Sequence, residues 1–300
     1  MEKLKELFDA KHSRRGFIAG VGVVGATAML AGCGDSTKPL QTPTPKPGIT
    51  DADILNFALN LEYLEAEFYL RAATGQGLSS ADAGSGAGAV TGGSVVTFPT
   101  PTLQQYAFEI AQDELNHVRF LRKALGSAAV ARPAIDLTNS FNGLAMAAGI
   151  GSTFNPFADS NSFLLGAFVF EDVGVTAYHG AAGLLTDKTN LGAAAGIMAV
   201  EAYHAAEIRA LIYAHSVSNP SDPFLADANK VSALRAMLGG GNETPISATS
   251  IVAADTTNAI AFERTTDQVL HIVYAAGAGV ATKGGFFPNG LNGKITATTA

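Results

Sequence analysis

Two short segments of this chain place a glutamate and a histidine three residues apart. They are Glu114 with His117, and Glu201 with His204. On a helix, residues i and i+3 lie on one face about one turn apart, so both side chains reach a common point. Carboxylate and imidazole groups suit iron, manganese and, less selectively, zinc. Each segment therefore predicts half of a metal site.

The neighbours of both pairs indicate that these faces are buried. Apolar residues recur at helical spacing on the same stripes, which is the pattern of a core-facing helix. They are Leu103, Ala107, Ile110, Leu121 and Leu125 in the first segment and Ala194, Ile197, Ile208 and Ile212 in the second. A buried carboxylate without a partner is costly, so such groups are paired, hydrogen-bonded or bound to a metal.

Two earlier glutamates complete the set. Residues 56–69 and 165–178 align when Glu62 is placed on Glu171, and this alignment also superposes Tyr69 on Tyr178. The chain thus reads as a doubled helical hairpin. Glu65 lies on a neighbouring stripe and competes with Glu62 as the ligand from the first helix. The repeat favours Glu62, because Glu65 falls opposite a glycine, and leaves Glu65 as a partner of a ligand or a spare ligand.

These six residues resemble a known ligand set. They are Glu62, Glu114, His117, Glu171, Glu201 and His204. The pattern is similar to that of the di-iron and di-manganese carboxylate proteins of the ferritin-like superfamily. Residues 59–75, 264–277 and 284–295 narrow the resemblance to bacterial ferritin-like proteins related to desiccation-related proteins.

The resemblance implies an all-α, ferritin-like four-helix bundle of two hairpins with a long crossover. It also implies two bound metal ions, iron or manganese, with the six residues as ligands. The hydroxyls of Tyr69 and Tyr178 would then hydrogen-bond ligands, although both rings also suit a plain core. The alternative is that the ancestral metal site has been lost while the fold remains. His179 and His271 have no partner at ligand spacing and are interpreted as structural.

Periodicity and breakers place the elements. Helices are expected over about 51–73, 102–125, from about 160, and over 189–214, with 127–158 as the crossover. The Gly- and Ser-rich residues 75–99 are expected to be either mobile or an edge embellishment. Helical spacing at 230–238 and 266–276 predicts one or two helices packed on the bundle, with an irregular tail.

The N-terminus has the features of an export signal. Arg14 and Arg15 lie in a twin-arginine motif, and an uncharged apolar run at 18–30 is short for a spanning helix. Leu-Ala-Gly before Cys33 resembles a lipobox, in which the cysteine carries a lipid. The expected organisation is a signal peptide at 1–32, a Pro- and Thr-rich tether at 33–49, the bundle at 50–216 and a C-terminal extension at 217–300.

Composition narrows the partners. The net charge is −7, which argues against nucleic-acid binding. Cys33 is the single cysteine, so this sequence has no internal disulfide and no Cys-x-x-Cys metal site. The expected partners are the twin-arginine export machinery, the membrane through the lipid on Cys33, and a small oxidant. The expected location is the cell envelope or periplasm, and the oligomeric state stays open, a homo-oligomer included.

The implied chemistry is redox reaction of peroxide, or of dioxygen with ferrous ion, at the two metals. Ferroxidase, catalase and peroxidase activities all fit, and the absence of a rubredoxin-like cysteine pair disfavours a self-contained peroxidase. Two other classes remain open. One is a non-catalytic desiccation or stress protein of the envelope, and the other is a metal-binding or delivery lipoprotein without turnover.

Overall fold

Four long helices form the framework of the computed structural model, which describes residues 48–299. They are α3 (Asp51–Thr74), α5 (Pro101–Leu125), α7 (Ser160–Ala182) and α8 (Lys188–Ser218). Each begins after a residue whose side chain accepts a hydrogen bond from the first turn: Thr50, Thr100, Asp159 and Asp187. The expected helices and the all-α bundle are confirmed.

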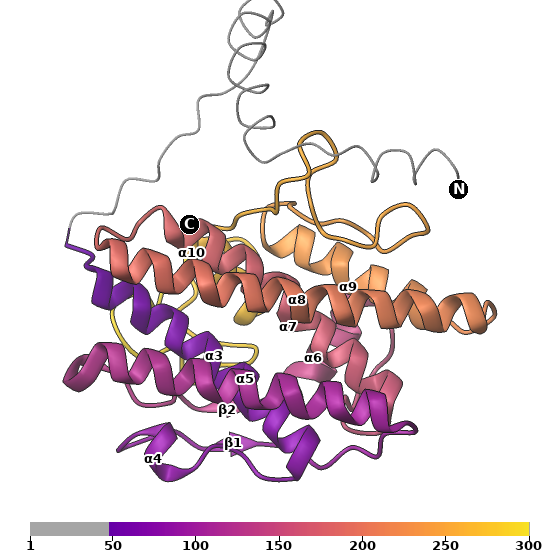
Figure 1. Ribbon diagram of the computed structural model, residues 1–300, viewed down its shortest axis with the longest axis horizontal. Coiled ribbons are helices and arrows are strands. Elements are labelled where there is room, and N and C mark those ends of the chain that lie inside the picture. Colours follow the sequence, from indigo (N-terminus) through magenta and orange to yellow (C-terminus); the bar gives the residue numbers. More distant parts are fainter. Residues whose placement is uncertain (1–47, 300) are drawn as a thin grey trace, which may run out of the picture. The chain divides into compact units, whose positions relative to one another are not determined.

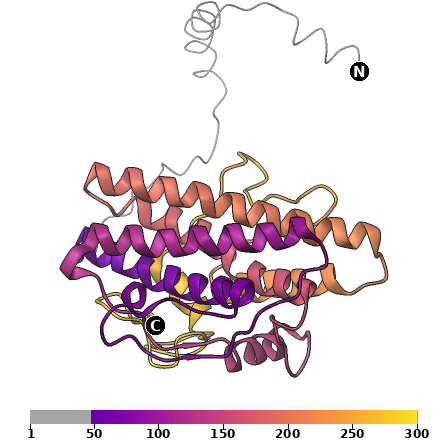
Figure 2. The ribbon, with the colours of Figure 1, turned by 60° about the horizontal axis from the view of Figure 1, so that its bottom comes forward.

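The helices pair as two antiparallel hairpins, α3 with α5 and α7 with α8 (Figures 1 and 2). The start of α3 lies beside the end of α5. The evidence is the Asn56 amide, which donates to the carbonyl of Ala128, three residues after α5 ends, at 2.9 Å. The same end of α3 holds the second hairpin: the Asp51 carboxylate accepts hydrogen bonds from the backbone of Thr186 and Asp187. The two hairpins therefore meet along α3 and α7.

The insertion after α3 and the crossover between the hairpins are joined to each other. The insertion contains α4 (Ser80–Ala83) and β1 (Val90–Thr91); the crossover contains η1 (Gly126–Ala128), β2 (Ile135–Asp136) and α6 (Asn139–Ala148). Strands β1 and β2 pair in parallel, with Val90 opposite Ile135. Val96 is buried and its N–H donates to the carbonyl of Ala72 at 2.8 Å. Residues 75–99 were expected to be either mobile or an addition packed at the edge of the bundle, and the structure supports the second expectation.

An aromatic cluster fills the core between α3, α6 and α7. Phe68 is fully buried at its centre. Its ring lies within 6 Å, centroid to centroid, of those of Phe141, Phe157, Phe163 and Phe170. Aromatic rings carry much of the buried apolar area of a core, so this cluster fixes α3 against α7 beside the predicted site.

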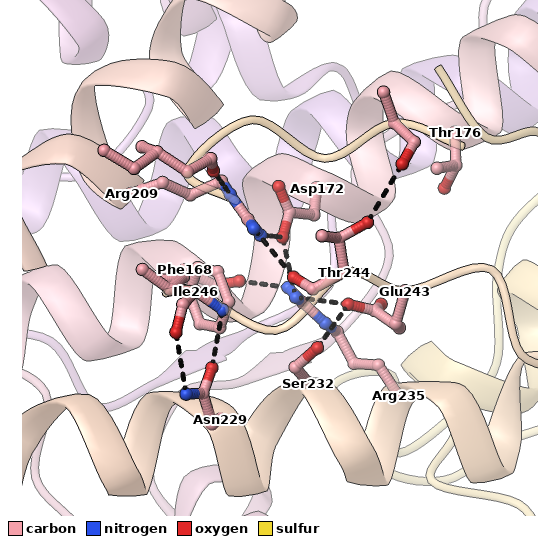
Figure 3. A network of polar contacts seen from close by, with 12 residues as sticks. Phe168, Asp172, Thr176, Arg209, Asn229, Ser232, Arg235, Glu243, Thr244 and Ile246 are labelled. Carbon is pink, nitrogen blue, oxygen red and sulfur yellow. Dashed lines mark hydrogen bonds and ion pairs between the residues drawn. The ribbon is translucent and has the colours of Figure 1, made fainter. Parts of the chain in front are cut away.

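The C-terminal third packs against the outer face of α7 through α9 (Phe224–Leu238), α10 (Thr266–Val273) and irregular segments. A buried polar network joins it to the bundle (Figure 3). Asp172 of α7 accepts hydrogen bonds from Arg209 of α8 and Arg235 of α9, each at 2.8 Å. The expected helices packed on the bundle are therefore present, followed by the expected irregular tail.

Several predictions concern residues outside the described range. The export motif with Arg14 and Arg15, the lipobox with Cys33 and all but the end of the tether lie outside residues 48–299. Within residues 48–299, no helix is both long enough and apolar enough to cross a membrane.

Candidate metal centre

All six predicted ligands come together in the middle of the bundle. The four glutamates are at most 1% exposed, and His204 and His117 are 4% and 8% exposed. Their donor atoms form two groups, in each of which the atoms lie within 4.8 Å of one another. One group comprises Glu62, Glu114, His117 and Glu201, and the other comprises Glu114, Glu171 and His204.

The first group is centred on Nδ1 of His117. This nitrogen lies 3.2 Å from Glu62 Oε2, 3.4 Å from Glu201 Oε1 and 3.5 Å from Glu114 Oε2. The glutamates come from α3, α5 and α8, so three helices converge on one imidazole nitrogen.

The second group is centred on Nδ1 of His204. It lies 3.2 Å from Glu114 Oε1 and 3.6 Å from Glu171 Oε2. Glu114 therefore directs one oxygen to each histidine. A carboxylate between two ligand groups is placed to bridge two cations.

Many of these buried atoms have no hydrogen-bond partner. Within residues 48–299 the unpaired atoms of the cluster are both carboxylate oxygens of Glu114 and of Glu201, Glu171 Oε2 and His204 Nδ1. Buried polar groups are normally satisfied, and each exception calls for an explanation. Apart from the hydrogen bond between His117 Nδ1 and Glu62 Oε2, these donor atoms converge without hydrogen-bonding one another. Such convergence fits shared metal ions, so the buried Glu/His cluster is compatible with a di-metal site.

The two tyrosines connect the hairpins at the site. The Tyr69 hydroxyl donates to Glu171 Oε1, and the Tyr178 hydroxyl donates to Glu62 Oε1. Burial, and next the facing carboxylate, raise the pKa of both phenols well above their ordinary value, which keeps them protonated as donors. Each tyrosine thus contacts the glutamate of the opposite hairpin. Of the two roles expected for these tyrosines, a hydrogen bond to a predicted ligand and a plain core ring, the structure shows the hydrogen bond.

Glu65 lies beside the cluster without joining either group. It is 5% exposed, and burial and then the charge of Glu201 raise its pKa well above the ordinary value. A Cβ added to Gly174 would lie 3.4 Å from Glu65 Oε1 and only 2.3 Å from Glu201 Oε2. The glycine that the repeat aligns with Glu65 therefore leaves space for both carboxylates.

Burial and charge determine the protonation of the metal-free cluster. Burial raises the pKa of Glu62 to about 7, against the opposing effect of His117. Burial alone would lower the pKa of His204, but Glu171 and Glu114 raise it to about 12. Burial alone would raise the pKa of Glu114, but the two histidines hold it well below its ordinary range. Metal binding must therefore displace protons from this cluster.

One residue of the site escaped the sequence analysis. Asp113 Oδ2 lies 3.3 Å from His204 Nε2, on the ring nitrogen opposite the cluster. A carboxylate directly before the first Glu-x-x-His pair was the available signal. His179 and His271 lie apart from the cluster and direct Nδ1 to the carbonyls of Phe262 and Ala276, as a structural role predicts.

Comparison with known proteins bears on the same residues. The family model of the ferritin-like domain matches residues 50–214. The chain is 30% identical over 265 residues to the ferritin-like catalase Nec2 of Nesocodon mauritianus, a match covering 82% of this chain and 84% of that protein. It is 32% identical over 271 residues to the desiccation-related protein PCC13-62 of Craterostigma plantagineum, with the same two coverages.

Proposed function

Because this chain belongs to the ferritin-like family, we propose that its buried Glu/His cluster holds two redox-active metal ions, iron or manganese, and acts on peroxide, or on dioxygen with ferrous ion. The convergence of unpaired carboxylate and imidazole atoms in the bundle carries the proposal. An ordinary core would leave no such set unsatisfied.

The chain's own residues have distinct parts in this proposal. Glu62, Glu201 and His117 would hold one ion, Glu171 and His204 would hold the other, and Glu114 belongs to both groups. Tyr69 and Tyr178 keep Glu171 and Glu62 in place through their hydroxyls. Metal ions bound by these residues would supply the electron transfer. The apolar core around the cluster excludes bulk water.

The ferritin-like catalase among the relatives supports peroxide as the substrate. In peroxide disproportionation, two H₂O₂ give two H₂O and one O₂, so one peroxide is oxidised while the other is reduced. This reaction needs no external electron donor, which suits a chain with a single cysteine. Oxidation of ferrous ion by dioxygen is the related reaction of the same site.

We also propose that the protein works outside the cytoplasm, tethered by a lipid on Cys33. The twin-arginine motif and the lipobox support this location. Twin-arginine export carries folded proteins, so metal would be loaded in the cytoplasm, where availability rather than affinity order selects it. Cys33→Ser should abolish incorporation of labelled fatty acid and release the protein from the membrane fraction; unchanged fractionation would contradict the tether.

The first experiment measures metal and turnover together. Protein purified without added metal is analysed by plasma mass spectrometry and assayed for O₂ evolution from H₂O₂ without a reductant. We expect about two iron or manganese ions per chain, with both metal and activity lost in the Glu114→Ala/Glu201→Ala double variant. Asp227→Asn, at a surface ion pair remote from the cluster, is the control and should match wild type. Absence of metal in wild-type protein would contradict the proposal.

A non-catalytic role is the second candidate, favoured by the desiccation-related relative. In that role the metals brace the bundle without turnover. It predicts that the double variant loses thermal stability and metal together, while the metal-loaded wild type evolves no O₂ and oxidises no ferrous ion. Turnover by the loaded protein excludes it.

A further inference from the structure

The metal centre follows the internal repeat of the chain closely. The first hairpin contributes Glu62 and the second contributes Glu171 at the equivalent place, and the two Glu-x-x-His pairs correspond in the same way. The tyrosines follow the same two-fold pattern, since the Tyr69 hydroxyl donates to Glu171 and the Tyr178 hydroxyl donates to Glu62. A departure from this two-fold pattern is therefore a property of this chain that the repeat does not require.

Asp113 is such a departure. It directly precedes Glu114, and the residue that directly precedes Glu201 is Val200. Asp113 Oδ2 lies 3.3 Å from Nε2 of His204, across the gap between α5 and α8. The hydrocarbon side chain of Val200 offers His117 no acceptor. Among residues 48–299, the polar contacts of His117 all run through Nδ1, and none reaches its Nε2.

The contact of Asp113 governs which nitrogen of His204 is available. A neutral imidazole carries its proton on one nitrogen and its lone pair on the other. A carboxylate at Nε2 favours the proton there, so the lone pair stays on Nδ1, which faces Glu114 and Glu171. The same contact fixes the ring orientation, whereas no partner from the described part of the chain reaches Nε2 of His117.

We propose that Asp113 is a positioning residue that makes the two halves of the metal centre unequal. The ion held by His204, Glu171 and Glu114 is retained more firmly than the ion held by His117, Glu62, Glu201 and Glu114, because among the described residues only His204 has a carboxylate at its outer nitrogen. The proposal rests on the proposed function, because it presupposes that the cluster binds two ions. Loss of a carboxylate that orients a metal-bound histidine weakens metal binding by about 10- to 100-fold. The Asp113 side chain is 38% exposed, so we expect the lower end.

The test measures how fast each ion leaves. Full-length protein is loaded with Mn²⁺ alone, mixed with excess EDTA, and sampled over time for retained manganese. Wild type should lose its two ions in two phases of equal amplitude, with rates that differ by about 10-fold. In Asp113→Ala the slow phase should accelerate by about 10-fold and merge with the fast one. Asp113→Asn, which keeps an acceptor oxygen, should restore part of the difference.

Two further variants distinguish positioning of the histidine ring by a carboxylate from a general effect of negative charge near the cluster. Val200→Asp places a carboxylate of similar size at the equivalent position of the other Glu-x-x-His segment, and it should slow the fast phase. Glu109→Ala removes an exposed negative charge one turn earlier on α5 and should leave both phases unchanged.

Three results would overturn the inequality: a single release phase from wild type, unchanged release from Asp113→Ala, or equal effects of Glu109→Ala and Asp113→Ala. Wild-type protein that takes up fewer than two Mn²⁺ ions would instead reject the di-metal function itself. The loading step reveals that failure before any release is measured.

Discussion

At the scale of single residues, Glu114 connects the two halves of the centre. Its Oε1 lies 3.2 Å from His204 Nδ1 and its Oε2 lies 3.5 Å from His117 Nδ1. It is the one residue common to both groups of ligand atoms found among residues 48–299. Its loss should therefore affect both ions, whereas loss of Glu62 or Glu171 should affect mainly one.

Replacement of Glu114 by glutamine tests this arrangement. The amide keeps the size of the side chain but removes the negative charge and one of the two oxygens. We expect Glu114→Gln to lose both metal ions and Glu62→Gln to lose about one. Plasma mass spectrometry of dialysed protein gives the stoichiometry. Retention of two ions by Glu114→Gln would show that Glu114 does not bridge them.

The pKa shifts of the cluster predict how the stability of the metal-free protein depends on pH. The pKa of Glu62 rises from 4.5 to about 7 on folding, and that of His204 rises from 6.5 to about 12. Above pH 5 the folded state therefore holds protons that the unfolded state has released, so the free energy of unfolding falls as pH rises. The contribution of His204 is complete below pH 6.5 and is lost progressively toward pH 12. Glu114 has a lowered pKa and acts in the opposite sense, but below this window.

Denaturant titration of chelator-treated protein at pH 5, 7 and 9 measures this effect. We expect the free energy of unfolding to fall by about 1 kcal/mol or more across the range, since one pKa unit corresponds to about 1.4 kcal/mol. Metal-loaded protein should vary less, because the ions replace the protons. A metal-free protein that gains stability toward pH 9 would contradict the protonation described for the cluster.

At the scale of elements, Gly174 allows α7 to approach α8 at the site. A Cβ there would lie 2.3 Å from Glu201 Oε2, closer than real contacts allow, so the carboxylate must move. Gly174→Ala should therefore reduce metal retention. It should not destabilise the helix backbone, because alanine has the higher helix propensity. Gly196→Ala on α8 is the matched control, since its Cβ meets nothing within 4 Å.

Metal stoichiometry and the denaturation midpoint are measured for both glycine variants. Loss of metal in Gly174→Ala alone, with stability of the metal-free protein maintained, is the expected outcome. Equal metal content in the two variants would mean that Glu201 can bind from a shifted position.

The elements also show how far the sequence could predict this structure. The four long helices and the convergence of the six Glu and His residues were predictable, because apolar periodicity and the repeat of Glu62 on Glu171 are local patterns. The role of Asp113 was not, since it depends on how closely α5 approaches α8. Strands β1 and β2 have two residues each and exist through pairing across the chain, which leaves no periodic signal. The partners of Asp172 come from α8 and α9, far apart in sequence.

At the scale of the whole molecule, α7 connects the metal centre to the C-terminal extension. Glu171 faces the cluster. The next residue, Asp172, accepts hydrogen bonds from Arg209 and Arg235 on a different face of the helix (Figure 3). Arg235 also lies over the ring of Phe168, 4.3 Å from its centre. These two covered faces explain why the helix is apolar nearly all round yet carries two adjacent acids at its middle.

Asp172→Ala should therefore be among the most destabilising single changes in the chain. It leaves Arg209 and Arg235, which are 1% and 2% exposed, without this carboxylate. Removing one partner of a buried charge pair costs about 3–5 kcal/mol, which denaturant titration can measure. Asp227→Ala breaks an ion pair to a Lys230 side chain that is 46% exposed and should cost at most about 1 kcal/mol. Since Asp172 faces away from the ligands, the folded fraction of Asp172→Ala should still bind two metal ions. Equal losses of stability in the two variants would show that the network does not hold the extension in place.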